Sequence, residues 1–339
     1  MGKNIQKVAV LGAGTMGSRI AAHLANAGVP CLLLDIVGPD KEARNRIAEM
    51  GLEGARKSKP AAFFEPGLAR LISTGNFEDD LSRLASVDWI IEAVVEDLEI
   101  KRALLRKVEA ARRPGTIVTT NTSGLPVSKI AEGFSEDFRR HWFGTHFFNP
   151  PRYMRLLEII PTQETEAAAL ETISHFCDVR LGKGIVLAKD TPNFIANRIG
   201  TFSALNVMRI MQEMDLTIEQ VDALTGPAVG WPKSATFRTA DLVGLDVLAH
   251  VVGNLKQNVS DERSDLQVPQ FLQIMLERRW LGDKTGGGFY KKAGKGEQAE
   301  RLALDWRTLE YRPRQKASLP ALEMARNVDD TGQRLRMLL

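Results

Sequence analysis

Short apolar runs alternate with amphipathic stretches along the first half of the chain. Lys7–Leu11 is a run of the kind that forms a buried strand, and in Thr15–Ala27 the apolar residues recur at helical spacing until Gly28, a common helix stop. This alternation predicts a parallel sheet covered by helices. The other strands and the next helix are expected at Val29–Leu34, Val87–Val95, Thr116–Thr120, Gly144–Phe147, Leu156–Ile160 and Ile185–Ala188, and at Leu98–Arg112.

The pattern changes after Asp190. Apolar residues form one long helical stripe over Pro192–Met214, and helical periodicity continues through Leu255 and again over Val268–Arg279. Strand signals nearly vanish in this part of the chain. We therefore predict a doubly wound α/β domain of the Rossmann type over residues 1–189, followed by an all-helical domain over residues 190–292. The broad apolar stripe predicts a homodimer formed through the helical domain.

Residues 293–339 form the last stretch. It is polar and charged at its beginning, contains Pro313 and Pro320, and ends in a helical pattern over Leu319–Leu339. We expect a linker followed by the start of a further helical region. The final residues, Met337-Leu338-Leu339, are apolar and carry no helix stop, which indicates a cut rather than a natural terminus.

The composition agrees with two domains and excludes several classes of protein. The chain has 339 residues, 44% hydrophobic and 26% charged, and an ordinary domain has roughly 100–200 residues. A formal net charge of +3 gives no whole-molecule attraction to nucleic acid.

No apolar run approaches the roughly 20 residues that span a membrane, and the first strand begins too early for a signal peptide, so we expect a cytoplasmic protein. The cysteines and histidines show no metal-ligand spacing, and no metal is expected.

A glycine-rich motif follows the first strand. Gly12-Ala13-Gly14-Thr15-Met16-Gly17 opens the first helix, and Asp35 ends the next strand. In this context the motif is a dinucleotide-binding fingerprint: Gly12 permits the tight turn, Gly14 admits the pyrophosphate, and Gly17 lets the helix pack closely. Asp35 is expected to accept hydrogen bonds from the ribose hydroxyls and to repel a 2′-phosphate. The predicted cofactor is therefore NAD rather than NADP.

A second group of polar residues indicates chemistry. Ser123 lies just past the end of an expected strand, where ligands of α/β sheets bind, although a helix N-cap explains it equally well. His146 lies among aromatic residues and is by itself more typical of a core histidine. Glu158, however, lies inside an apolar strand, and a buried carboxylate needs a partner that His146 can provide. Asn197, near the domain boundary, is by itself a cap or an interdomain hydrogen-bonding group.

Together these motifs resemble NAD-dependent L-3-hydroxyacyl-CoA dehydrogenases. The resemblance covers residues 5 to about 292, and its segments are Gly12–Gly17, Asn121-Thr122-Ser123, His146–Pro150, Leu157-Glu158, Lys189–Arg198 and Thr285–Tyr290. It implies the NAD-dependent, reversible oxidation of a (3S)-3-hydroxyacyl-CoA thioester to a 3-ketoacyl-CoA in fatty-acid β-oxidation.

The resemblance also implies a role for each site residue. His146 would take the hydroxyl proton as C3 passes its hydride to the nicotinamide, with Glu158 raising the basicity of His146. Ser123 and Asn197 would hydrogen-bond the reacting oxygens. The resemblance also assigns five residues to cofactor binding, besides the glycines and Asp35: Thr15, Met16, Glu96, Lys101 and Asn121. The family usually has Asn where this chain has Asp97.

Two further features concern the acyl-CoA thioester and the whole protein. In the family the acyl-CoA lies in the cleft between the two domains, and the basic stretch Lys41–Lys59 is a candidate for its phosphates, with a solvated helix face as the equal alternative. The stretch Pro232–Thr239 looks like the dehydrogenase portion of long bacterial multifunctional β-oxidation proteins, which also carry an enoyl-CoA hydratase. The present chain has no region of hydratase length.

Two other functions compete with this interpretation. A related two-domain dehydrogenase acting on a 3-hydroxy acid or a sugar acid usually has a lysine at the position of the base, whereas this chain has His146 with Glu158. A non-catalytic NAD-binding protein would be expected to have lost one of the four residues Ser123, His146, Glu158 and Asn197, and all four are present.

Overall fold

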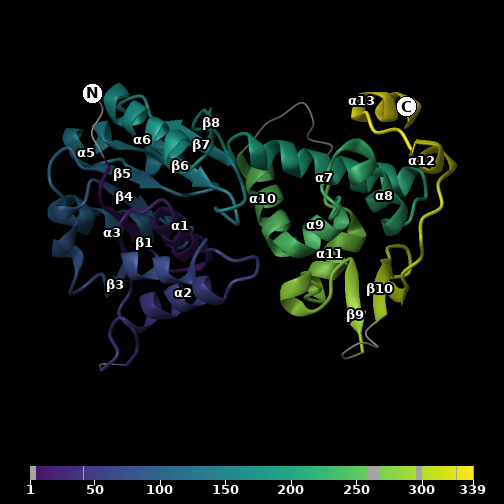
Figure 1. Cartoon of the computed structure of the whole chain (residues 1–339), viewed down its shortest axis with the longest axis horizontal. Helices are drawn as coiled ribbons and strands as arrows, with labels where there is room; N and C mark the ends of the chain where they lie inside the picture. Colours follow the sequence, from purple (N-terminus) through teal and green to yellow (C-terminus); the bar gives the residue numbers. More distant parts are fainter. Residues whose placement is uncertain (1–4, 41, 259–266, 295–299, 326, 339) are drawn as a thin grey trace. The chain divides into compact units, whose positions relative to one another are not determined.

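The computed structural model describes residues 5–40, 42–258, 267–294, 300–325 and 327–338. The chain forms two compact units, Met1–Ile195 and Ala196–Leu339 (Figure 1). Among the described residues, no helix is both long enough and apolar enough to cross a membrane.

The first unit is built on one eight-stranded sheet with the strand order β3-β2-β1-β4-β5-β6-β7-β8. All neighbouring strands are parallel except β6 and β7, which are antiparallel. The order reverses direction at β1, and the crevice beyond this point is where α/β sheets bind ligands. The strands are β1 (Val8–Leu11), β2 (Cys31–Asp35), β3 (Ile72–Asn76), β4 (Trp89–Glu92), β5 (Ile117–Thr120), β6 (Trp142–Phe147), β7 (Leu156–Pro161) and β8 (Gly184–Leu187).

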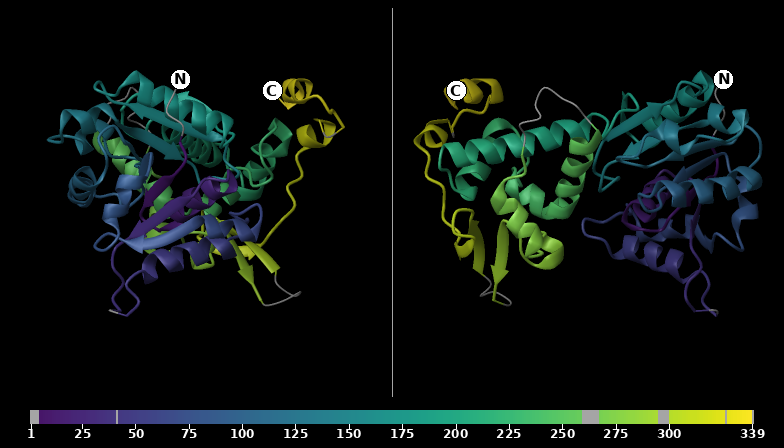
Figure 2. Two further views of the ribbon diagram at one scale, coloured as in Figure 1. Left: turned by 60° about the vertical axis from the view of Figure 1, so that its left-hand side comes forward. Right: turned by 180° about the vertical axis from the view of Figure 1, so that it is seen from behind.

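Helices cover both faces of this sheet (Figures 1 and 2). Because successive side chains of a strand point to opposite faces, Val8 and Val10 of β1 belong to one apolar cluster, while Ala9 and Leu11 belong to another. The first cluster includes residues of α1 and α6, and the second includes residues of α3, α4 and α5. The helical elements are α1 (Thr15–Asn26), α2 (Arg46–Lys57), η1 (Pro66–Leu71), η2 (Leu81–Ser86), α3 (Leu98–Ala111), α4 (Val127–Ile130), α5 (Glu136–Arg140) and α6 (Ala167–Val179). The predicted Rossmann-type fold is confirmed.

The structure adds an edge strand that the apolar pattern does not reveal. Strand β3 has the sequence Ile-Ser-Thr-Gly-Asn and pairs with β2 alone. A strand at the edge of a sheet needs little apolar character, because only part of its surface is buried. The paired strand β2, by contrast, is buried along nearly its whole length.

The second unit is mainly helical, as predicted. Its apolar core includes Leu205, Met208, Phe237, Leu272 and Phe289. The long helix begins at Ala196 rather than Pro192, because Asn193 and Phe194 adopt left-handed backbone angles that a helix cannot contain. The helical elements are α7 (Ala196–Glu213), α8 (Ile218–Leu224), η3 (Pro227–Val229), α9 (Phe237–Val243), α10 (Leu245–Asn258), α11 (Gln270–Glu277) and η4 (Asp283–Thr285).

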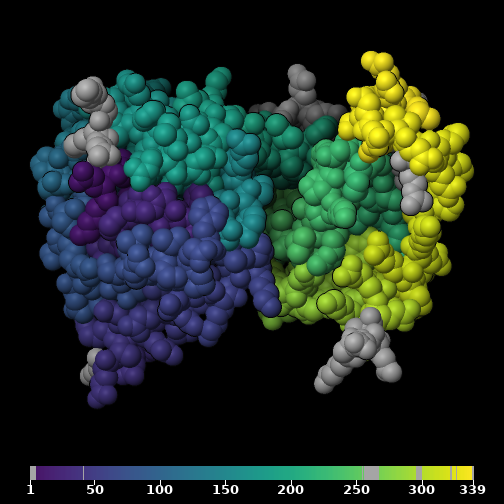
Figure 3. Space-filling view, viewed as in Figure 1, coloured from purple at the N-terminus to yellow at the C-terminus, as the bar shows by residue number. Residues whose placement is uncertain are grey.

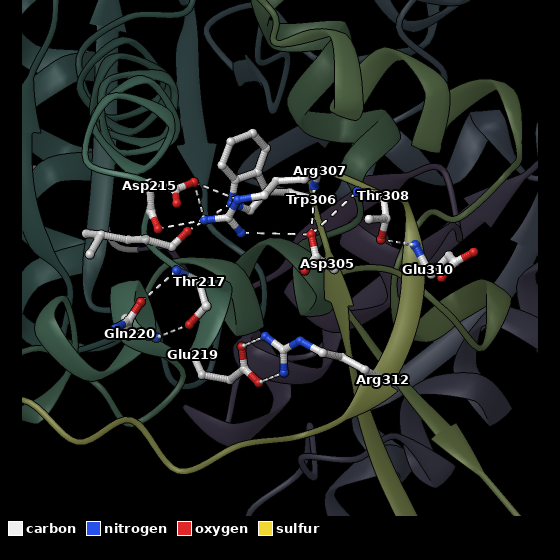
Figure 4. A network of polar contacts seen from close by, with 11 residues as sticks. Asp215, Thr217, Glu219, Gln220, Asp305, Trp306, Arg307, Thr308, Glu310 and Arg312 are labelled. Atoms are coloured by element: carbon white, nitrogen blue, oxygen red, sulfur yellow. Dashed lines mark hydrogen bonds and ion pairs between the residues drawn. The ribbon is translucent and has the colours of Figure 1, made fainter.

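The stretch after residue 292 is not the linker that its polar composition indicates. It contributes to a three-stranded antiparallel sheet of β9 (Tyr290–Ala293), β10 (Glu300–Asp305) and β11 (Glu310–Pro313). Charged residues that resemble a solvated linker are bound to the helical part of this unit: Arg312 forms a two-point ion pair with Glu219 of α8, and Arg307 binds Asp215 in the turn between α7 and α8 (Figure 4). The linker prediction is therefore wrong over residues 300–313.

Two short helices follow this sheet, α12 (Pro320–Ala325) and α13 (Thr331–Leu338). Figure 3 shows them, in yellow, at the surface of the second unit. Arg334 of α13 donates a hydrogen bond to the carbonyl oxygen of Pro227 in η3, at 3.2 Å, and so attaches the tail to the helical core. The helical pattern predicted for the end of the chain is thus present in two pieces.

Candidate active site

The glycine-rich turn between β1 and α1 leaves its backbone accessible at one point. Gly12 has a φ of 102°, and a Cβ atom there would lie 2.5 Å from the carbonyl oxygen of Ala93. A Cβ atom at Gly17 would lie 1.8 Å from the carbonyl oxygen of Gly12, so only glycine permits this contact between helix and turn. At Gly14, in contrast, a Cβ atom would meet nothing within 4 Å, and both Gly14 and Thr15 are exposed. The open space lies at the N-terminus of α1, where backbone N–H groups favour a phosphate.

Asp35, at the end of β2, is held beside this turn. Its Oδ2 accepts a hydrogen bond from the backbone N–H of Ala13 at 2.5 Å, and its Oδ1 accepts one from the N–H of Ile36 at 2.7 Å. Each carboxylate oxygen has a further lone pair, so Asp35 can also accept bonds from two ribose hydroxyls. The open turn, the helix N-terminus and Asp35 together fit NAD, which when bound supplies a nicotinamide ring that accepts a hydride.

Lys101 of α3 is buried rather than exposed to a ligand. Its side chain is 1% exposed, and its Nζ lies 2.7 Å from Oε1 of Glu92 and 3.3 Å from Oε2 of Glu96. Glu92, 0% exposed at the end of β4, also accepts a hydrogen bond from the hydroxyl of Thr120 at 2.6 Å. Lys101 therefore links β4, β5 and the loop after β4.

Glu96 connects this buried ion pair to the Ser123 loop. Its Oε1 accepts hydrogen bonds from the hydroxyl of Thr122 at 2.5 Å and from the backbone N–H groups of Ser123 and Gly124, both at 2.9 Å. Burial alone would raise the pKa of the Glu96 carboxyl. The charge of Lys101 and these three hydrogen bonds outweigh that effect and lower the pKa, so Glu96 is an anion that fixes the loop.

His146 and Glu158 form a buried pair. They are register partners on the antiparallel strands β6 and β7, and Nδ1 of His146 lies 2.8 Å from Oε2 of Glu158. His146 is 5% exposed and Glu158 is 0% exposed. The predicted contact is present, and a carboxylate on one ring nitrogen orients the imidazole and leaves Nε2 to exchange a proton.

The segment just before the second unit completes the surroundings of this pair, and the sequence did not single out these contacts. The backbone N–H of Ile195 donates a hydrogen bond to Oε1 of Glu158 at 3.1 Å. The rings of Phe148 and Phe194 lie 4.5 Å and 5.6 Å from the imidazole, measured between ring centres. Phe194 has a φ of 49°, a conformation that costs a bulky residue about 1–3 kcal/mol and commonly marks a functional site.

The other predicted site residues occupy different surroundings. Oδ1 of Asn121 accepts a hydrogen bond from the backbone N–H of Phe147 at 2.9 Å, which joins the loop after β5 to the end of β6. Ser123 is half-buried in that loop. Asn197 is the second residue of α7 and belongs to the second unit. Its hydrogen bond to a reacting oxygen stays a prediction.

The basic stretch before and along α2 has the properties of a solvated helix face. Lys41 lies outside the described residues, while Lys57 is exposed and pairs with Glu53 at 3.0 Å, one turn earlier on the same helix. Arg44 pairs with Asp79 at 2.6 Å. A contact of this stretch with acyl-CoA phosphates stays a prediction. In the described part of the chain, no three His, Cys, Asp or Glu residues are grouped as metal ligands.

Comparisons with known families match both units. Residues 7–191 match the family described as 3-hydroxyacyl-CoA dehydrogenase, NAD binding domain, and residues 194–292 match its C-terminal domain. In structure, the chain is similar to Mycobacterium tuberculosis FadB2, with a TM-score of 0.72 and 30% identity over 86% of this chain and 100% of that one.

Two curated bacterial relatives carry the name probable 3-hydroxyacyl-CoA dehydrogenase. The Bacillus subtilis protein is 47% identical over 100% of this chain, which spans only 44% of that relative's length. The Deinococcus radiodurans protein is 46% identical over 93% of this chain and 91% of its own length. Both domain matches and this level of identity lead to one conclusion: the chain belongs to the 3-hydroxyacyl-CoA dehydrogenase family.

Proposed function

We propose that this protein oxidises (3S)-3-hydroxyacyl-CoA thioesters to 3-ketoacyl-CoA with NAD⁺ as a step of fatty-acid β-oxidation. The observation that carries the proposal is the buried pair of His146 and Glu158, 2.8 Å apart, in the same unit as the open glycine turn and Asp35. A dehydrogenase needs a proton acceptor and a dinucleotide site together, and family membership supports the same reaction.

The proton acceptor is Nε2 of His146. When the N–H at Nδ1 donates a hydrogen bond to Oε2 of Glu158, the other ring nitrogen carries a lone pair. This lone pair accepts the proton of the substrate hydroxyl. When this O–H bond breaks, NAD⁺ held by the glycine turn and Asp35 would supply the acceptor for the hydride on C3, and the C3 carbonyl would form. Glu158 stabilises the positive charge that the imidazole gains, and the N–H of Ile195 holds the Glu158 carboxylate in place.

Ser123, with Asn197, is proposed to hydrogen-bond the reacting oxygens. The anionic Glu96 supports this role for Ser123, since it binds the backbone N–H groups of Ser123 and Gly124 and leaves the Ser123 hydroxyl to the substrate. We assign Lys101 a positioning role, because its ammonium is buried against Glu92 and Glu96.

His146→Gln tests the assignment of the base. The variant should bind NADH as the natural protein does and lose about 10²–10⁴-fold in kcat with acetoacetyl-CoA, followed by NADH absorbance, because a general base contributes about that factor. His175→Gln is the matched control, since His175 lies on the exposed side of α6. Turnover of His146→Gln at the natural rate would show that His146 is not the base.

The substrate class is tested by comparing acetoacetyl-CoA with free acetoacetate, each with NADH and with NADPH. We expect activity with the thioester and NADH. Activity with the free acid and none with the thioester would favour a 3-hydroxy-acid dehydrogenase, and no turnover of either would favour a non-catalytic NAD-binding protein.

Three further properties belong to this proposal. We propose a homodimer formed through the helical unit, a cytoplasmic location, and an enoyl-CoA hydratase on a longer natural chain, with a separate dehydrogenase as the alternative. The Bacillus subtilis relative, of which this chain spans 44%, supports a longer protein, whereas the Deinococcus radiodurans relative, of which it spans 91%, supports the alternative. Light scattering measures the oligomeric state. To test for a hydratase, the product of acetoacetyl-CoA reduction is incubated with the complete protein, and dehydration of that product is measured.

A further inference from the structure

The second unit has a hollow of about 510 Å³ whose lining includes none of the candidate active-site residues. Helices α8 and α9, strands β9 and β10, and the residues that directly follow β11 contribute to its walls. A smaller hollow of about 300 Å³ adjoins it and shares Arg238, Tyr290 and Arg301 with it. A volume of this size lies within the roughly 300–1,000 Å³ of small-molecule sites.

The carboxylates around this hollow are already satisfied by protein groups. Glu219 accepts two hydrogen bonds from Arg312, at 2.7 and 2.9 Å (Figure 4). Asp222 accepts the hydroxyl hydrogen of Tyr290 and the backbone N–H of Phe237, both at 2.7 Å. These negative groups are therefore committed to holding the wall of the hollow.

Asp283, at the rim of the smaller hollow, is also committed. It accepts two hydrogen bonds from Arg238, at 2.5 and 2.7 Å. These bonds lower the pKa of the Asp283 carboxyl against the opposing effect of burial. The charges of Arg301 and Lys292 lower it further, which indicates that the positive potential extends over both hollows.

Four cationic side chains, in contrast, have no carboxylate of a described residue within ion-pair distance. Lys233, Arg301, Arg314 and Lys316 line the main hollow, are exposed, and form no ion pair with any residue that the structure describes. Arg314 also lies over the ring of Tyr290, 5.7 Å from its centre, which orients its guanidinium. Like charges that line one hollow repel one another, and an anion bound among them relieves this repulsion.

We propose that this hollow binds a small ligand that carries a pyrophosphate group. Two arginine forks, Arg301 and Arg314, suit the planar two-point contacts that phosphate oxygens make, and Lys233 and Lys316 add point charges. A concave site of nucleotide size favours a small polyanion over an extended one. The site is separate from the glycine turn and does not depend on the proposed dehydrogenase activity.

Calorimetric titration tests the proposal, with the protein saturated with NADH so that the dinucleotide site is filled. The probes are inorganic phosphate, pyrophosphate, ADP and CoA. We expect the three probes that contain a pyrophosphate group to bind about tenfold or more tightly than phosphate, because they add charge-assisted hydrogen bonds. The affinities for ADP and for CoA are each compared with the affinity for pyrophosphate alone. This comparison identifies which of these pyrophosphate-containing molecules the site prefers.

Paired variants provide the control. Arg301→Gln with Arg314→Gln should weaken pyrophosphate binding about tenfold or more. Arg278→Gln with Arg336→Gln removes the same charge from exposed positions of the same unit that line neither hollow, and it should change binding less than about twofold. Thermal unfolding confirms that both proteins fold. Three results would overturn the proposal. They are the absence of saturable binding, an equal loss of pyrophosphate affinity in the two double variants, and tighter binding of a single-stranded oligonucleotide than of any small probe.

Discussion

The buried ion pair of Lys101 and Glu92 should dominate the stability of the cofactor-binding unit. Lys101→Met removes the ammonium and leaves the Glu92 carboxylate 0% exposed without its cation. Breaking a buried pair in this way costs about 3–5 kcal/mol. Glu92 keeps hydrogen bonds from the Thr120 hydroxyl at 2.6 Å and from the Val94 N–H at 2.7 Å, so we expect the lower end, about 3 kcal/mol.

The same helix offers a matched control. Lys107 of α3 pairs with Glu78 at 2.9 Å, nearly the same distance, but the two side chains are 53% and 58% exposed. Lys107→Met should therefore change the free energy of unfolding by less than about 1 kcal/mol, because water screens an exposed pair.

Urea denaturation followed by tryptophan fluorescence measures both variants. The double variant Lys101→Met with Glu92→Gln should recover a large part of the free energy of unfolding that Lys101→Met loses. The reason is that the uncompensated buried carboxylate is no longer present. The reasoning is refuted if Lys101→Met is as stable as Lys107→Met, or if the double variant loses the sum of the two single changes.

Three further predictions concern the proton acceptor, the cofactor and a buried histidine. Glu158→Gln removes the charge bonded to the proposed base and should lower kcat with acetoacetyl-CoA about tenfold or more, because a hydrogen bond to a charged group is lost; an unchanged kcat contradicts the pairing. Asp35→Ala combined with Ile36→Arg should raise the ratio of kcat/KM with NADPH to kcat/KM with NADH about tenfold or more in steady-state assays. An unaltered ratio would show that Asp35 does not select the cofactor. Burial, and then the charge of Lys183, lower the pKa of His23 from 6.5 to about 4, so the unfolded chain binds the extra proton between these values. In a urea series, the free energy of unfolding of the natural protein relative to that of His23→Phe should therefore fall by about 3 kcal/mol as the pH drops from 6.5 to 4, and a constant difference would contradict the assignment.

The sequence predicted the parts of the site that have a local signal. The glycine turn follows an apolar strand, and Glu158 is a carboxylate inside an apolar strand, so each was recognisable without knowledge of the fold. Glu92 carries the same signal within Val87–Val95, and reading it in the same way would have indicated a buried cation. The assignment of Lys101 to the cofactor comes from the resemblance, and its burial against Glu92 has no local signal, because no pattern shows that a lysine on a charged helix points inward.

Features set by distant contacts were beyond prediction. Strand β3 has few apolar residues and depends on its pairing with β2. Strand β11 similarly pairs with β10, and its Arg312 binds Glu219, a residue far away in the chain. The left-handed backbone at Phe194 has no signal in its residue type, since phenylalanine rarely adopts it.

The single antiparallel pairing in the sheet separates catalysis from specificity. Because His146 and Glu158 face each other across the ladder of β6 and β7, backbone hydrogen bonds set their spacing and no loop does so. Loops other than those that carry Ser123 and Ile195 can therefore lengthen, shorten or change sequence during evolution while the proton acceptor keeps its geometry. The same property suits redesign: libraries confined to these other loops should yield proteins with altered substrate preference and an intact base, whereas a change of register in either strand should abolish activity on every substrate at once.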